Sequence, residues 1–288
     1  MLNIKGIITA LITPFNEDGT VNYDKLGELI LDQINNNIET IIIGGTTGEG
    51  MLIDNILEFY NKTIEIVDKR LTVGVTLFEY KKQELLQIIK IINQLPCDFV
   101  LVNTPYYLST SSNGIVEYYN LIDQHLNKPY IIYYNPIRSG QYIINSTWDK
   151  LFKLNNLIGI KDASNDCFTS NYIIKNKKNL LYFTGNDTNY FNNRILGSDG
   201  LISSAANLLP KVFTKIEYLI NKSDFKQAKE LYFKYYDLLK NINVEPNPIG
   251  LKYLMNEKGL NVGDPKFPLT KLSFNQQIKL KTIYEGVK

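Results

Sequence analysis

The sequence is poor in the residues that bind metals or form disulfides. It contains one histidine, His125, and two cysteines, Cys97 and Cys167, which lie far apart in the chain. A zinc site needs about four nitrogen or sulfur ligands, so this set does not favour one. We expect no metal and no cofactor. Because no secretory signal is recognisable, the two thiols are expected to be reduced and the protein cytoplasmic.

Other absences narrow the function further. The longest apolar runs are too short to span a bilayer, so no membrane segment is expected. Lysine and arginine number 31 against 29 acidic residues, a net charge of +2 that favours neither a nucleic-acid nor a membrane partner. Neither a Gly-x-Gly-x-x-Gly pattern nor a P-loop is present. The chemistry must therefore come from side chains acting on small molecules.

Short apolar runs alternate with longer amphipathic stretches along the first two hundred residues. The predicted strands are Gly6–Ile12, Thr40–Gly45, Thr72–Thr76, Asp98–Asn103, Pro129–Tyr134, Leu157–Lys161, Leu180–Thr184 and Gly200–Ser203. Strict strand–helix alternation predicts a parallel sheet of the α/β class, and eight units close into a (β/α)₈ TIM barrel. An open doubly wound sheet is the alternative, but it would need a phosphate-binding glycine turn.

The pattern changes after Ser203. Four helical stretches follow without a strand between them: Leu208–Ile220, Phe225–Lys240, Pro248–Glu257 and Phe274–Tyr284. We therefore predict a catalytic barrel over residues 1–222 and a C-terminal helical extension over residues 223–288.

In such a barrel the active site lies where the strands end, and a glycine-rich segment, Gly44–Gly50, follows the second strand. It contains two threonines, Thr46 and Thr47. Glycines let the backbone approach a ligand closely, and the amides and hydroxyls could hold a carboxylate. A tight turn between strand and helix is the alternative interpretation.

A lysine, Lys161, ends the sixth apolar run. At the mouth of a barrel its amine could lose water and attack a ketone to form a Schiff base, whereas a solvated surface lysine would not. Tyr107, Tyr133 and Tyr134 follow other strands and could either pack or carry protons. Arg138, one of three arginines, could bind a carboxylate in bidentate fashion or form a surface ion pair.

These pieces resemble the dihydrodipicolinate synthase / N-acetylneuraminate lyase family of Schiff-base aldolases. The similar segments are, in order, Gly6–Phe15, Gly45–Glu49, Thr104–Tyr107, Gly159–Lys161 and Glu245–Ile249. The resemblance implies a (β/α)₈ barrel with a helical extension, assembled as a homotetramer that is a dimer of dimers. It also implies that pyruvate binds to a lysine as an imine before a carbon–carbon bond forms or breaks.

The resemblance implies a role for each matching residue. Lys161 would form the imine. Tyr133 and Thr46 of the same chain would relay protons together with Tyr107, which would come from a neighbouring subunit. The substrate-binding residues would be Gly45, Thr47, Arg138, Gly185 and Ile202.

Two questions stay open in the sequence. The family usually has Tyr-Asn-x-Pro where this chain has Tyr133-Tyr134-Asn135-Pro136. Alignment on Pro136 selects Tyr133, whereas alignment on Tyr-Asn selects Tyr134. Neighbouring strand residues point to opposite faces, so only one can serve, and we select Tyr133 because a gap-free alignment also places Arg138 at the synthase arginine.

The second question is the substrate. Arg138 and the Glu245–Ile249 segment resemble synthases that condense pyruvate with aspartate semialdehyde in lysine and diaminopimelate biosynthesis. A pyruvate-dependent lyase that cleaves N-acetylneuraminate or a 2-keto-3-deoxy sugar acid is the second hypothesis. A catalytically silent binding protein on the same scaffold is the third.

Overall fold

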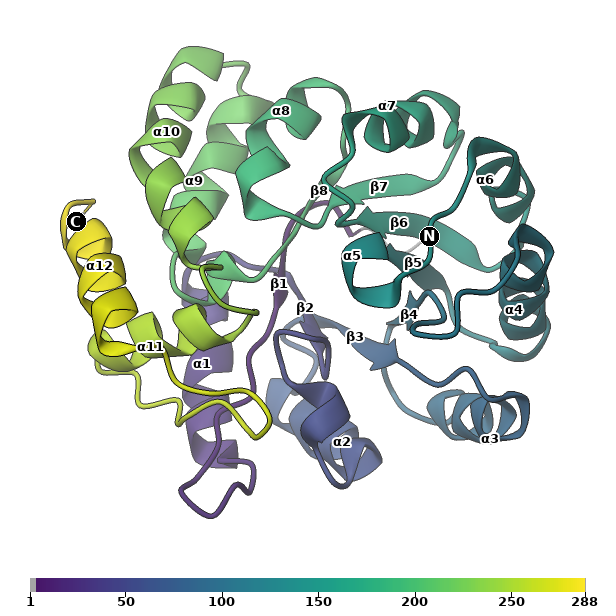
Figure 1. The fold of residues 1–288 in the computed structure, drawn as a ribbon, viewed down its shortest axis with the longest axis horizontal. Coiled ribbons are helices and arrows are strands. Elements are labelled where there is room, and N and C mark those ends of the chain that lie inside the picture. The colour runs from purple at the N-terminus through teal and green to yellow at the C-terminus, as the bar shows by residue number, and fades with distance from the viewer. Residues whose placement is uncertain (1–3, 288) are drawn as a thin grey trace. The chain divides into compact units, whose positions relative to one another are not determined.

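The computed structural model describes residues 4–287, in which strands and helices alternate (Figure 1). The strands are β1 (Gly6–Ala10), β2 (Thr40–Ile43), β3 (Thr72–Leu77), β4 (Phe99–Asn103), β5 (Tyr130–Tyr134), β6 (Leu157–Asp162), β7 (Leu181–Thr184) and β8 (Gly200–Ser203). The α-helices are α1 (Tyr23–Asn35), α2 (Ile56–Val67), α3 (Lys82–Ile92), α4 (Ser112–His125), α5 (Pro136–Ser139), α6 (Asn145–Leu151), α7 (Cys167–Asn176), α8 (Tyr190–Ile195), α9 (Pro210–Asn221), α10 (Phe225–Asn241), α11 (Ile249–Glu257) and α12 (Phe274–Glu285). Short 3-10 helices cover Gly50–Leu52, Asp187–Asn189 and Ala205–Asn207.

The strands form a closed barrel in the order β1 to β8. The TIM-barrel prediction and the helical C-terminal segment are thereby confirmed. Nearly every strand residue is buried, which explains why the strands read as continuous apolar runs.

Residue contacts divide the chain into two compact units. Among the described residues, the first contains residues 4–5 and 73–202, and the second contains residues 6–72 and 203–287. The predicted domain boundary between residues 222 and 223 stays a prediction. Each unit is described by itself below.

In the first unit, helices α3, α4, α6 and α7 lie outside the strands β4 to β7 (Figure 1). Each strand from β3 to β7 pairs in parallel with the next, up to the pair of β7 and β8. The register pairs Tyr133 of β5 with Lys161 of β6, and Lys161 with Phe183 of β7, so these three penultimate strand residues lie at one level.

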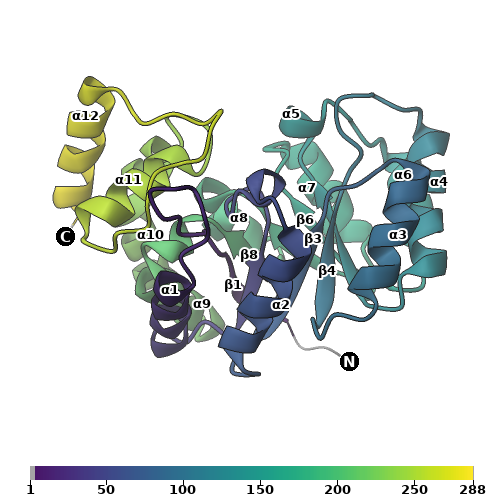
Figure 2. The same ribbon diagram turned by 90° about the horizontal axis from the view of Figure 1, so that it is seen from below.

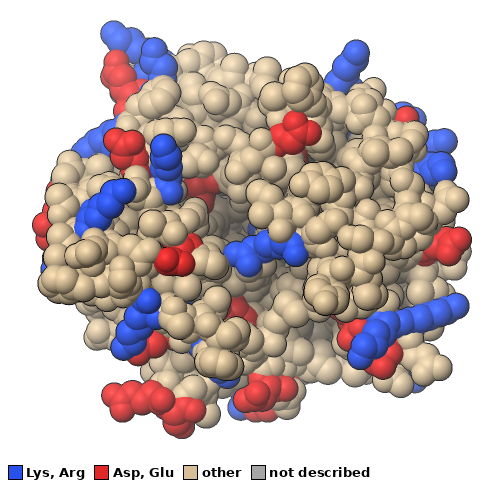
Figure 3. Space-filling view, viewed as in Figure 1, with Lys and Arg blue, Asp and Glu red and all other residues tan. Residues whose placement is uncertain are grey.

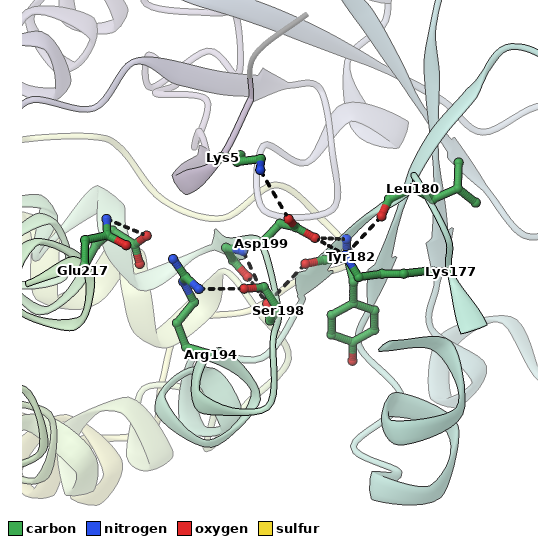
Figure 4. A network of polar contacts seen from close by, with 10 residues as sticks. Lys5, Lys177, Leu180, Tyr182, Arg194, Ser198, Asp199 and Glu217 are labelled. Carbon is green, nitrogen blue, oxygen red and sulfur yellow. Dashed lines mark hydrogen bonds and ion pairs between the residues drawn. The ribbon is translucent and has the colours of Figure 1, made fainter. Parts of the chain in front are cut away.

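A polar network fixes the start of β7 and β8 (Figure 4). The Asp199 carboxylate contacts Lys177 and Lys5 and accepts a 3.0 Å hydrogen bond from the backbone nitrogen of Tyr182. The Ser198 hydroxyl donates to the backbone oxygen of Tyr182 at 3.1 Å, and Arg194 donates to the Ser198 backbone oxygen at 2.7 Å. Backbone groups at this end of the strands therefore have side-chain partners.

In the second unit, β1 and β2 pair in parallel, with Ile8 opposite Thr40. Helix α9 packs on β1 and α10, and α12 packs on α10 and α11, as Figure 2 shows for the C-terminal helices. The side chain of Asn207 joins this layer to β1, because it donates to the backbone oxygen of Ala10 at 2.8 Å and accepts from the nitrogen of Ile12 at 3.0 Å.

The charged side chains are dispersed. Figure 3 shows Lys, Arg, Asp and Glu as separate spots of both signs on the face that it displays. Within residues 4–287, no helix combines the length and hydropathy needed to cross a bilayer.

Candidate active site

Lys161 lies at the carboxyl end of β6, and its side chain is almost dry. The residue is 7% exposed, and its Nζ lies 4.1 Å from the centroid of the Tyr133 ring on β5. A primary amine shielded from water at a strand end is the group that an imine-forming enzyme needs.

The neighbouring carboxylate of Asp162 faces other partners. It accepts hydrogen bonds from the hydroxyl of Tyr182 at 2.8 Å, the hydroxyl of Ser170 on α7 at 3.0 Å and the backbone nitrogen of Ser164 at 2.8 Å. Burial raises the pKa of the Asp162 carboxyl, and these hydrogen bonds oppose the rise. This network fixes the strand end from which Lys161 projects.

Tyr133 and Tyr134 lie in different surroundings. The Tyr133 hydroxyl accepts a 3.1 Å hydrogen bond from Nδ2 of Asn135, and its ring lies against the Lys161 amine. Tyr134 instead makes an edge-to-face contact with Trp148 of α6, at 5.3 Å between ring centroids. Burial raises the pKa of Tyr134 to about 12. Which of the two acts in catalysis stays a prediction.

Asn135 links Tyr133 to the helix that carries Arg138. Its Oδ1 accepts from the backbone nitrogen of Arg138 at 3.2 Å, which caps the four-residue helix α5. Gly140 ends this helix with a φ of +69°, a conformation that glycine adopts without strain. The predicted site residues did not include Asn135, although an Asn before Pro is a helix-start signal that could have drawn attention to it.

Tyr107 projects into solvent in the single chain. Its side chain is 88% exposed, and its backbone adopts a φ of +70°. The Tyr107 nitrogen donates to the backbone oxygen of Ser139 at 3.0 Å, which ties the loop after β4 to the end of α5.

Gly185 and Ile202, the two remaining predicted residues of this unit, lie at the ends of β7 and β8. A Cβ atom at Gly185 would lie 2.8 Å from the Ala163 Cβ and 2.9 Å from the Asp162 carbonyl oxygen, so the position requires glycine. Ile202 is buried, with 1% of its surface exposed.

In the second unit, the Gly44–Gly50 loop follows β2. A Cβ atom at Gly50 would lie 1.8 Å from the Gly44 oxygen, and one at Gly44 would lie 2.5 Å from the Tyr60 ring. These close approaches explain why the loop is rich in glycine. Thr47 is buried, and its hydroxyl accepts a 2.9 Å hydrogen bond from Asn247.

Within residues 4–287, no group of three or more His, Cys, Asp or Glu side chains could hold a metal ion. The first unit places together the Lys161 amine, which is shielded from water, the Tyr133 phenol and the Asn135 amide. Asn135 caps helix α5, which carries Arg138. This arrangement can perform amine nucleophilic catalysis with proton transfer.

Known proteins are similar to the chain both in sequence and in structure. A 4-hydroxy-tetrahydrodipicolinate synthase from Clostridium perfringens is 32% identical over 283 residues, 96% of each chain. A chloride-inhibited dihydrodipicolinate synthase from Acinetobacter baumannii, solved in complex with pyruvate, superposes with a TM-score of 0.94 at 28% identity over 99% of each chain. A monomeric dihydrodipicolinate synthase variant superposes with a TM-score of 0.93 at 27% identity over 98% of this chain and 96% of that one.

The dihydrodipicolinate synthetase family matches residues 3–286, nearly the whole sequence. The resemblance that the motifs indicated is confirmed, and the chain belongs to this family.

Proposed function

We propose that the chain is a lyase of the 4-hydroxy-tetrahydrodipicolinate synthase type, which condenses pyruvate with aspartate semialdehyde. The observation that carries the proposal is the nearly dry Lys161 amine with the Tyr133 ring 4.1 Å from it. The names of the relatives and the pyruvate complex of the Acinetobacter baumannii protein support it.

In the proposed reaction, the neutral Lys161 amine attacks the keto carbon of pyruvate, and the carbinolamine loses water to give an imine. Loss of a proton from the pyruvate methyl carbon gives an enamine, which attacks the aldehyde carbon and forms the new bond. Protons must leave nitrogen and carbon and reach oxygen in these steps. The Tyr133 hydroxyl, oriented by Asn135, is the proposed donor and acceptor.

The other residues take the roles that family membership suggests. Thr46 of the same chain completes the proton relay together with Tyr107, which comes from a neighbouring subunit. The pyruvate carboxylate binds the loop of Gly45 and Thr47. The planar guanidinium of Arg138 binds the carboxylate of the semialdehyde, and Gly185 and Ile202 contact the substrate.

A homotetramer built as a dimer of dimers is part of the proposal. Its support is the exposure of large apolar side chains that a monomer would normally bury. They are Tyr107 at 88%, Leu108 at 64%, Tyr142 at 70% and Phe168 at 82%. A cytoplasmic location is also proposed, because Cys97 and Cys167 are both free thiols.

Borohydride reduction in the presence of pyruvate tests the imine. Mass spectrometry should find the reduced adduct on Lys161 in the wild type and none in Lys161→Arg. Lys175→Arg, an exposed lysine of α7, is the matched control and should trap pyruvate normally. A wild type that carries no adduct on Lys161 overturns the proposal.

A panel of aldehydes and sugar acids then tests the substrate. We expect turnover with aspartate semialdehyde and none with N-acetylneuraminate or 2-keto-3-deoxy sugar acids. Trapping on Lys161 with cleavage of a sugar acid, and without condensation of aspartate semialdehyde, would keep the imine and replace the synthase by the lyase.

A further inference from the structure

A fully buried ion pair lies within the second unit. Nζ of Lys252, on α11, lies 2.6 Å from Oε1 of Glu49, and both side chains have 0% exposure. Glu49 is the penultimate residue of the Gly44–Gly50 loop. Removing two charges from water is costly unless both are paired and hydrogen-bonded, so such a pair requires a structural or functional reason.

Both charges have additional partners. Oε2 of Glu49 accepts a 2.7 Å hydrogen bond from the backbone nitrogen of Lys266. Nζ of Lys252 donates to the backbone oxygen of Asp264 at 3.2 Å and lies 4.3 Å from the centroid of the Phe15 ring. Burial lowers the pKa of Lys252, and the Glu49 carboxylate opposes the shift. Residues 247–266, here called the C-terminal segment, thus supply a partner for each oxygen of the Glu49 carboxylate.

The backbone of Glu49 is also unusual. It has φ 53° and ψ 32°, the left-handed conformation, which costs energy for a residue other than glycine. Its nitrogen donates to the Thr46 oxygen at 3.1 Å, so the turn that holds the two threonines closes at Glu49. Anchoring of the Glu49 side chain therefore stabilises the conformation of the turn itself.

A second contact reaches the same loop from the same segment. Asn247, which precedes α11 by two positions, donates from Nδ2 to the Thr47 hydroxyl at 2.9 Å. The loop is thus held at Thr47 by Asn247 and at Glu49 by Lys252.

We propose that Glu49 and Lys252 are positioning residues for the keto-acid carboxylate. The buried pair holds the Thr46–Thr47 turn in the shape that binds the carboxylate, and Asn247 orients the Thr47 hydroxyl. The C-terminal segment thereby sets the affinity for pyruvate without touching it. This inference rests on the proposed function, because it uses the carboxylate role of the Thr46–Thr47 loop.

The test uses a double variant, Glu49→Gln with Lys252→Met, which leaves no unpaired buried charge. In the full-length protein, we expect KM for pyruvate to rise ~10-fold or more while kcat changes by less than ~3-fold, because ground-state and transition-state binding of the carboxylate weaken together. KM for the aldehyde should stay constant. A general loss of folded protein would lower apparent kcat instead.

Glu257 and Lys281 provide a matched control, since they form an ion pair at 2.6 Å within the same unit, with side chains 30% and 49% exposed. The double variant Glu257→Gln with Lys281→Met should leave KM for pyruvate unchanged. Asn247→Ala gives an independent measurement if the buried double variant does not fold, and it should also raise KM for pyruvate selectively.

An unchanged KM for pyruvate in the folded buried-pair variant overturns the inference, and so does an unchanged KM in Asn247→Ala when the buried-pair variant does not fold. The two proposals fail separately. A wild type that traps no pyruvate on Lys161 refutes the proposed function, whereas normal trapping with unchanged KM values refutes the positioning role alone.

Discussion

Lys161 and Tyr133 occupy paired positions on neighbouring strands, and the amine of the first lies over the ring face of the second. The contact holds the amine beside the phenol. A proton must leave the amine nitrogen as the imine forms, and the Tyr133 hydroxyl lies on the same ring.

Removal of single hydroxyl groups separates Tyr133 from Tyr134. Tyr133→Phe keeps the ring under Lys161 and removes the proton carrier, so kcat should fall by roughly 10²–10⁴-fold. Tyr134→Phe keeps the contact with Trp148 and should change kcat by less than about threefold. Steady-state kinetics with circular dichroism as a folding control measure both. The reverse order of effects would select Tyr134.

Mixing two inactive variants tests whether Tyr107 acts in a neighbouring subunit. Tyr107→Phe and Lys161→Ala should each be nearly inactive. In a mixed dimer the subunit that retains Lys161 receives Tyr107 from its partner, so one of two sites recovers. Co-refolded mixtures should regain about a quarter of wild-type activity, because about half of randomly formed dimers are mixed.

Absence of recovery in a mixture shown by native mass spectrometry to contain mixed assemblies would place Tyr107 in the site of its own chain or outside any site. A wild-type rate for Tyr107→Phe alone would remove the residue from the mechanism.

Asp199 should be important for stability and unimportant for catalysis. Its carboxylate is 16% exposed and holds Lys177 together with the Tyr182 backbone nitrogen. Asp199→Ala removes this acceptor from the Tyr182 nitrogen and leaves Lys177 with the Leu180 backbone oxygen, so the free energy of unfolding should fall by ~1–3 kcal/mol. Urea denaturation measures the change. Lys271→Ala, which removes a pair whose side chains are 68% and 60% exposed, should cost less than ~1 kcal/mol.

The two thiols should differ strongly in reactivity. Burial raises the pKa of Cys97 from 9.0 to about 11, whereas Cys167 is exposed. At pH 8, iodoacetamide should label Cys167 in native protein and leave Cys97 unlabelled until urea unfolds the chain. Peptide mass spectrometry shows which thiol is labelled first. Equal labelling of both thiols in native protein would contradict the predicted difference in reactivity.

The same pKa shift has a consequence for stability. The folded state keeps the Cys97 proton at pH values where the unfolded chain loses it. The contribution of the buried Cys97 thiol to the free energy of unfolding is fully present below pH 9 and is lost as the pH rises through about 11. Stability should therefore decline over this interval, and a Cys97→Ala variant should decline less steeply.

The local sequence pattern was sufficient to predict the barrel, because nearly every strand is buried along its length and is followed by an amphipathic or capped segment. It also located Lys161, since a charged residue at the end of an apolar run is conspicuous. Helix α5 was not predicted because four residues show no periodicity. Its signals were nevertheless present in Asn135, Pro136 and Gly140, which cap, start and end it.

The buried pair of Glu49 and Lys252 could not be predicted from local pattern. Lys252 lies in helix α11, and a lysine in a helix normally faces water. Its burial arises from contacts with distant segments, as does that of Glu49, which bonds to a residue 217 positions away. Neither position carries a periodic or motif signal for burial.

Because of this separation along the chain, Glu49 is synthesised long before the residues that contact it. When Glu49 is added to the growing chain, the residues that will contact its carboxylate are still about two hundred codons from translation. Until they emerge, the left-handed turn at Glu49 has no anchor, and its carboxylate remains hydrated. The loop after the second strand is thus among the first parts of the chain to be made, whereas the residues that anchor its Glu49 side chain are among the last.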